Sequence, residues 1–113
     1  QRRFPQAVLV GDLLGLPVLD GNDSTIGYVR QVVRSRDLKV FLIVPYSSSF
    51  GWLRTEYGKR PVAVPIELVA LLARQINAED MSREDFDRAP SWTPGQDDPI
   101  PAGEKTPIAL GRR

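Results

Sequence analysis

The chain contains no histidine and no cysteine among its 113 residues, and it has a single methionine. Without cysteine it can form neither a disulfide framework nor a thiolate zinc site. Without histidine no imidazole can serve as the base for a serine nucleophile, so Ser47, Ser48 and Ser49 are interpreted as ordinary loop residues. A glycine-rich phosphate-binding loop is also missing from the sequence. We therefore expect a protein that is not an enzyme and that uses no cofactor.

Neither the charge nor the hydropathy of the chain points to nucleic acid or to a membrane. Its 15 basic and 14 acidic residues leave a net charge of +1, which creates no broad field for a polyanion. The longest apolar runs, 40–45 and 68–73, are far shorter than the ~20 residues that span a bilayer. Because the chain starts at Gln1, we expect that preceding residues were removed, and the compartment stays open between cytoplasm and periplasm.

An acidic turn at 20–23 has some features of a calcium-binding loop. Asp20, Asn22 and Asp23 carry side-chain oxygens at close spacing, as calcium ligands do. The distal glutamate of such a loop has no counterpart, because 25–33 contains no acidic residue. The favoured interpretation is a hairpin turn, and no metal site is expected.

The composition, with ten prolines and nine glycines, predicts short strands separated by turns. The apolar positions of 25–35 do not keep a strict period of two, which predicts a bulge near Gly27 or Gln31. Ser82 and Asp85 have capping-box spacing and predict a short helix over 82–88, counting the cap. The strands are expected over 16–19, 25–35, 39–46, 61–64 and, after one helical turn, 74–77.

The chain is expected to form one domain with loose ends, of the size that a single modest core can stabilise. Residues 1–7 are interpreted as a lead-in, 8–92 as the domain, and 93–113 as a proline-rich tail. Within this tail, 108–110 are expected to add an edge strand. A curled sheet of this kind predicts a mainly β fold and a small β-barrel.

Several short patterns, in order along the chain, resemble the PRC-barrel family, a small β-barrel first defined in the photosynthetic reaction-centre H subunit. The patterns are Gly15–Val18, Asp20–Gly21, Ile26–Val29 and Val62–Pro65. The resemblance implies a barrel of about five to six strands with a short C-terminal helix and an irregular tail. The segment 81–92 and the ending at 108–113 are similar to bacterial single-domain members of the family.

Two departures from the family pattern limit what is carried over. Family members often have an acidic residue where this chain has Gln31, and 36–38 replaces a sharp Asp-Gly turn. A proton-conducting role is therefore not carried over. What the resemblance implies is protein docking, because members occur in the reaction-centre subunit and in a ribosome-maturation factor that docks on a ribosomal protein.

The sequence thus leads to a non-catalytic protein-interaction or adaptor module as the expected function. One alternative is a small-ligand-binding barrel with its mouth near Arg30, Arg34 and Glu67. The other is a ribosome or RNA-processing accessory protein, which the near-neutral charge disfavours.

The candidate partner-binding residues are Phe50, Trp52, Arg54 and Tyr57, in the loop expected over 46–57. Aromatic residues and arginine are enriched at interface hot spots. The expected partner is another protein, with a second copy of this chain as the alternative. A competing interpretation is that these rings plug one end of the barrel, since burying one aromatic side chain gives ~1.5–3 kcal/mol. Trp92 is expected to cover the barrel as well.

Overall fold

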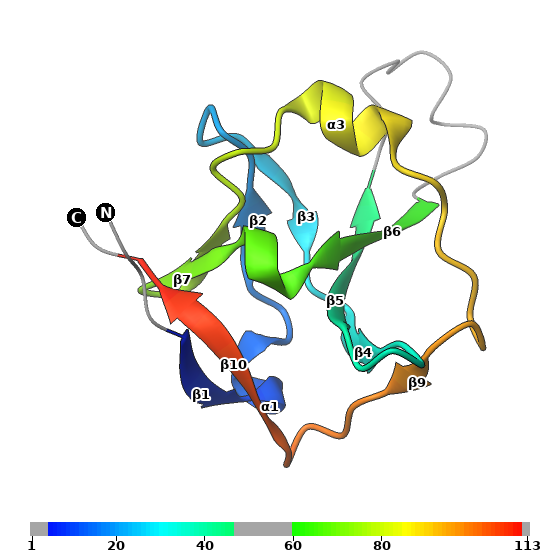
Figure 1. Cartoon of the computed structure of the whole chain (residues 1–113). Helices are drawn as coiled ribbons and strands as arrows, with labels where there is room; N and C mark the ends of the chain where they lie inside the picture. The colour runs from blue at the N-terminus through cyan, green and yellow to red at the C-terminus, as the bar shows by residue number, and fades with distance from the viewer. Residues whose placement is uncertain (1–4, 47–59, 112–113) are drawn as a thin grey trace.

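The computed structural model of the chain describes residues 5–46 and 60–111 (Figure 1). The strands are β1 (Pro5–Leu9), β2 (Pro17–Leu19), β3 (Thr25–Tyr28), β4 (Gln31–Arg34), β5 (Val40–Tyr46), β6 (Arg60–Pro65), β7 (Ala70–Leu72), β8 (Gln75–Asn77), β9 (Asp98–Pro99) and β10 (Lys105–Leu110). The described helices are α1 (Val10–Leu13) and α3 (Arg83–Arg88), and Ile66–Leu68 form the 3-10 turn η1. The expectation of a mainly β fold is confirmed.

The strands form two sheets that do not close into a barrel over the described ranges. The larger sheet has the order β1-β10-β7-β8-β2-β3, and the smaller one has the order β6-β5-β4-β9. Most neighbouring strands are antiparallel, but β10 pairs with β7, and β2 with β8, in parallel. The barrel expected from the sequence is therefore not confirmed as a closed structure.

The strand expected over 25–35 is two strands that belong to different sheets. The break falls at Val29 and Arg30: the Val29 N–H donates to the Leu16 carbonyl at 3.0 Å, and the Arg30 N–H donates to the Ile43 carbonyl at 2.8 Å. The chain thus leaves the larger sheet and joins the smaller one within two residues. The prediction of one continuous strand was wrong because the same apolar run supplies inward-facing side chains to both sheets.

The predicted irregularity near Gly27 is present, and the same glycine allows a close approach between two strands. The β2–β3 register shifts between Val18 and Leu19, so β3 carries one extra residue there. A Cβ added to Gly27 would lie 2.5 Å from the Pro45 carbonyl oxygen, closer than real Cβ atoms come. Glycine at this position therefore lets β3 pass directly against β5.

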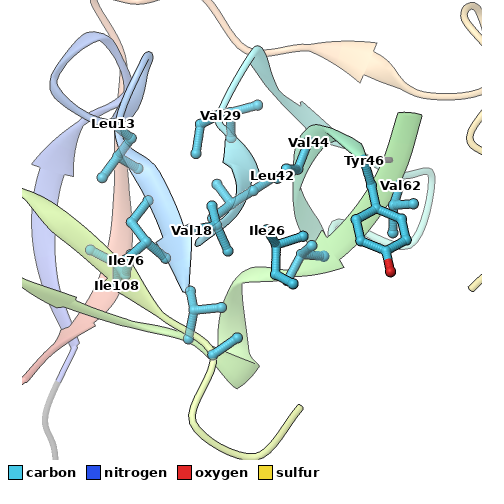
Figure 2. Packing of buried hydrophobic residues seen from close by; sticks show 14 of the residues in the cluster. Leu13, Val18, Ile26, Val29, Leu42, Val44, Tyr46, Val62, Ile76 and Ile108 are labelled. Atoms are coloured by element: carbon cyan, nitrogen blue, oxygen red, sulfur yellow. The ribbon is translucent and has the colours of Figure 1, made fainter. Parts of the chain in front are cut away.

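The core lies between the two sheets and is filled by aliphatic side chains (Figure 2). Both sheets contribute, and α1 adds two fully buried residues, Val10 and Leu13. Side chains therefore occupy the space between the sheets. Labelled members from the sheets are Val18, Ile26, Leu42, Val44, Tyr46, Val62, Ile76 and Ile108.

The described segments nearest the two ends of the chain contain more strand than the sequence suggested. Strand β1 begins at Pro5, inside the stretch interpreted as a lead-in, and pairs with β10 along its whole length. The expected edge strand over 108–110 extends over Lys105–Leu110, and it lies between β1 and β7 instead of at an edge. The first strand needs β10 as its partner, so the tail completes the larger sheet.

Candidate functional site

The candidate site is the connection between β5 and β6, whose two ends face each other in the sheet. Tyr46 and Arg60 are Cα partners in the antiparallel β5–β6 ladder. The residues on either side of 47–59 therefore occupy directly opposed positions in the ladder. The four predicted contact residues, Phe50, Trp52, Arg54 and Tyr57, lie outside the described residues, whereas both ends of the connection are described.

Tyr46 fixes the first end of the connection in the core. Its side chain is 0% exposed, and its ring packs against Phe86 of α3 with centroids 5.8 Å apart. The Tyr46 hydroxyl donates a hydrogen bond to the Asp87 carboxylate. Burial, together with this acceptor and its negative charge, raises the pKa of Tyr46 to about 12. The hydroxyl is thus held neutral and is built for structure, not for proton transfer near neutral pH.

Arg60 fixes the second end by capping α3. Its Nη1 donates to the Ala89 carbonyl at 2.6 Å, and its Nη2 donates to the Phe86 and Asp87 carbonyls at 2.9 and 2.8 Å. These carbonyls lie at the C-terminal end of the helix, where the Phe86 carbonyl also accepts from the Ala89 N–H at 3.3 Å. The Arg60 guanidinium also lies 5.8 Å from the centre of the Tyr46 ring. One arginine thereby joins β6, β5 and the helix.

Local sequence explains why a helix stands at this place. The predicted capping box is confirmed: the Asp85 N–H donates to the Ser82 hydroxyl at 3.3 Å, and the Ser82 N–H donates to the Asp85 carboxylate at 2.8 Å. The resulting turn and a half buries Phe86 fully. Figure 1 shows α3 beside the ends of β5 and β6. We call Tyr46, Arg60 and α3 the clamp.

Sequence reasoning missed the clamp, although it had noticed its parts. The helix over 82–88 and the loop that begins at residue 46 were predicted, but no contact between them was. Tyr46 and Asp87 are 41 positions apart, so no local spacing could have joined them. The one available signal was an aromatic residue at the end of a buried strand, which needs a hydrogen-bond partner for its hydroxyl.

The alternative mouth at Arg30, Arg34 and Glu67 is not assembled as one site. Arg34 forms an ion pair with Glu104 at 3.7 Å, and Glu67 lies exposed in η1. Arg30 lines a separate pocket on the outer face of the smaller sheet. Of the three residues that the small-ligand alternative names, only Arg30 therefore lines this pocket.

The acidic turn that resembled a calcium loop is a hairpin turn. The Asp20 carboxylate accepts hydrogen bonds from the N–H groups of Asn22 and Ser24 at 2.9 and 3.0 Å, and Asp23 has a positive φ of 62°. No group of three or more potential ligands is placed to hold a metal ion within the described ranges.

Trp92 is buried, but not at an end of the space between the sheets. It packs on the outer face of the smaller sheet with Val33 and Ile43. This placement corrects the expectation that it covers a barrel. The end of the core beside Tyr46 is covered instead by Phe86 of α3.

Among the described residues, none of the helices has the length and apolar character needed to cross a membrane. Comparison with known proteins finds no matching family model, no matching curated protein and no matching solved structure.

Proposed function

We propose that the chain is a non-catalytic protein-interaction module that docks through 46–57, with Phe50, Trp52, Arg54 and Tyr57 as its contacts. The observation that carries the proposal is the clamp at the base of this connection. A buried tyrosine and an arginine with three carbonyl partners hold its two ends. Binding segments are commonly carried on a rigid scaffold in this way.

The length of the connection also supports the proposal. Because Tyr46 and Arg60 oppose each other in the ladder, a two-residue hairpin turn could join them. The sequence instead has 13 residues, 47–59, between these two positions. Connections between the two strands of a hairpin usually have two to five residues, and a functional segment is one reason for a longer one.

The family resemblance adds a third line of support. Its patterns fall at β2, β3 and β6, which surround the core in the described structure. A PRC-type adaptor of bacterial origin is part of the proposal. Aliphatic side chains occupy the space between the sheets in the described ranges, which disfavours a small ligand there, and the net charge of +1 offers little to an RNA.

Two variants with the same kind of change at opposite ends of β5 test the proposal. Trp52→Ala removes a proposed contact, and Leu38→Ala removes a large apolar side chain that is 75% exposed in the turn before β5. We expect both variants to unfold at the urea midpoint of the unchanged chain. A photo-crosslinker placed at position 50 should trap a protein in native extract, and only Trp52→Ala should abolish this product.

Self-association is measured on the same samples by sedimentation velocity, which tests a second copy as the partner. A dimer that weakens with Trp52→Ala and not with Leu38→Ala identifies the partner as the chain itself. Loss of folding in Trp52→Ala would instead favour the interpretation in which the rings plug the core. A crosslinked product that survives Trp52→Ala would contradict docking through this residue.

A further inference from the structure

A pocket on the outer face of the smaller sheet lies outside everything assigned so far. It has a volume of about 220 Å³ and is lined by Arg30, Gln31, Ile43, Pro61, Trp92 and Pro94. These residues come from the start of β4, the middle of β5, β6 and the segment that follows α3. None of them belongs to the proposed docking segment 46–57, so the pocket is independent of the proposed function.

The walls of this pocket are apolar and fixed in place. Trp92 is only 6% exposed, and it belongs to the buried cluster that contains Ile43. Its backbone N–H donates to the Pro61 carbonyl at 2.8 Å, and its indole Nε1–H donates to the Asp97 carboxylate at 3.0 Å. Hydrogen bonds thus hold Trp92 both at its backbone and at its indole ring. A rigid aromatic surface loses little entropy when a ligand packs on it.

The charged group at the rim is the exposed side chain of Arg30. Its backbone is anchored by the hydrogen bond to the Ile43 carbonyl. Within the described ranges its guanidinium has no ion-pair or hydrogen-bond partner, whereas Arg34 is paired with Glu104. The nearest acid of the segment after α3, Asp97, accepts from the Trp92 indole and does not line the pocket. The rim therefore offers an unpaired cation with five donors beside an apolar wall.

The volume sets the size of what fits. A dry cavity of about 150 Å³ holds one benzene, and pockets for drug-sized molecules begin near 300 Å³. The pocket therefore suits one ring or one branched aliphatic group. A guanidinium next to it favours a carboxylate, to which arginine donates two parallel hydrogen bonds.

We propose that this pocket binds an apolar group that carries a carboxylate, with the ring or alkyl part against Trp92 and the carboxylate on Arg30. Gln31 supplies an amide donor next to the same carboxylate, and Pro61 and Pro94 complete the apolar wall. Two sources share this chemistry: a small free acid, and the C-terminal residue of a peptide. The experiment separates them.

The probes are phenylacetate for the free acid and the tripeptide Gly-Gly-Leu for the peptide C-terminus. Their neutral counterparts, phenylacetamide and Gly-Gly-Leu amide, keep the apolar part and remove the charge. Binding is followed by NMR through the indole N–H resonance of Trp92 at millimolar probe concentration. At least one acid should shift this resonance in a saturable way and bind more tightly than its amide.

Arg30→Gln and Arg34→Gln are matched variants that remove one positive charge each. Arg34 does not line the pocket, so Arg34→Gln should bind the acid like the unchanged chain. Arg30→Gln should weaken binding of the acid about tenfold, the effect of one lost charge-assisted hydrogen bond, and should erase the difference between acid and amide.

The two arms identify the source, because a free-acid site prefers phenylacetate and a peptide site prefers Gly-Gly-Leu. An unshifted Trp92 resonance with all four probes would overturn the proposal. Equal affinity for acid and amide, unchanged by Arg30→Gln, would overturn it too, because an apolar surface alone would then explain the binding.

Discussion

The two ends of β5 are connected to their neighbouring strands in very different ways. At the Val40 end, the turn from β4 closes within a few residues: the Ser35 N–H donates to the Lys39 carbonyl at 2.8 Å, and Leu38 takes a positive φ of 67°. At the Tyr46 end, the chain takes 13 residues to reach β6. Both ends join antiparallel neighbours of the same sheet.

This difference in length separates the residues that the sheet needs to connect its strands from residues that are additional to that need. The first connection shows that a tight turn is enough to keep β5 in register with a neighbour. The second connection is longer than two directly opposed strand ends require. Its two ends are held by the clamp of Tyr46, Arg60 and α3. A longer loop costs closure entropy, although the cost grows slowly with length. The 13 residues between Tyr46 and Arg60 are the segment through which we propose that the chain docks.

The largest difference between the two ends of β5 is expected when the positive charge of the clamp is removed. Arg60→Met keeps much of the aliphatic length and removes the guanidinium that donates to the Phe86, Asp87 and Ala89 carbonyls, although the Phe86 carbonyl keeps the Ala89 N–H as a donor. We expect the free energy of unfolding to fall by about 2 kcal/mol in urea titrations. Arg36→Met, in the short turn at the other end of β5, should change it by less than about 0.5 kcal/mol. Equal effects of the two variants would show that the ends do not differ.

A smaller and pH-dependent effect is expected for Tyr46→Phe. The variant loses the hydrogen bond to Asp87, at a cost of about 1 kcal/mol near neutral pH. In the folded chain the pKa of Tyr46 is raised to about 12 from an ordinary value of 10.0. The unfolded chain thus loses this proton first, so the tyrosine stabilises the fold fully below pH 10 and progressively less up to pH 12.

The measurement for Tyr46 is the unfolding free energy from urea titrations at several pH values between 8 and 12. The unchanged chain should lose stability over the upper half of this range, and Tyr46→Phe should lose less. If both chains show the same slope between pH 10 and 12, the Tyr46 hydroxyl is not the group that titrates.

The sequence was sufficient for elements that rest on short-range chemistry. The Ser82–Asp85 box predicted α3, and the Asp20 turn predicted its hairpin, because both depend on hydrogen bonds between residues less than five positions apart. The strand over 39–46 followed from its run of apolar residues. Each of these was confirmed because short-range hydrogen bonds or a run of buried residues is enough to indicate it.

Longer-range features could not be predicted in the same way. The change of sheet at Val29 and Arg30 depends on which strand each backbone group reaches, and the position of β10 inside the larger sheet depends on a partner about 100 residues away. The clamp depends on Asp87 meeting Tyr46 across the fold. Periodicity reports which side chains are buried, but it does not report against which element.

The most direct test of the central claim replaces 47–59 with the two residues Asn-Gly, which favour a tight hairpin turn between Tyr46 and Arg60. We predict a folded chain, more stable by roughly 1.5 kcal/mol because the connection is shorter, in which the crosslinked partner or the dimer is lost. A shortened chain that fails to fold, or that still binds its partner, would contradict the account.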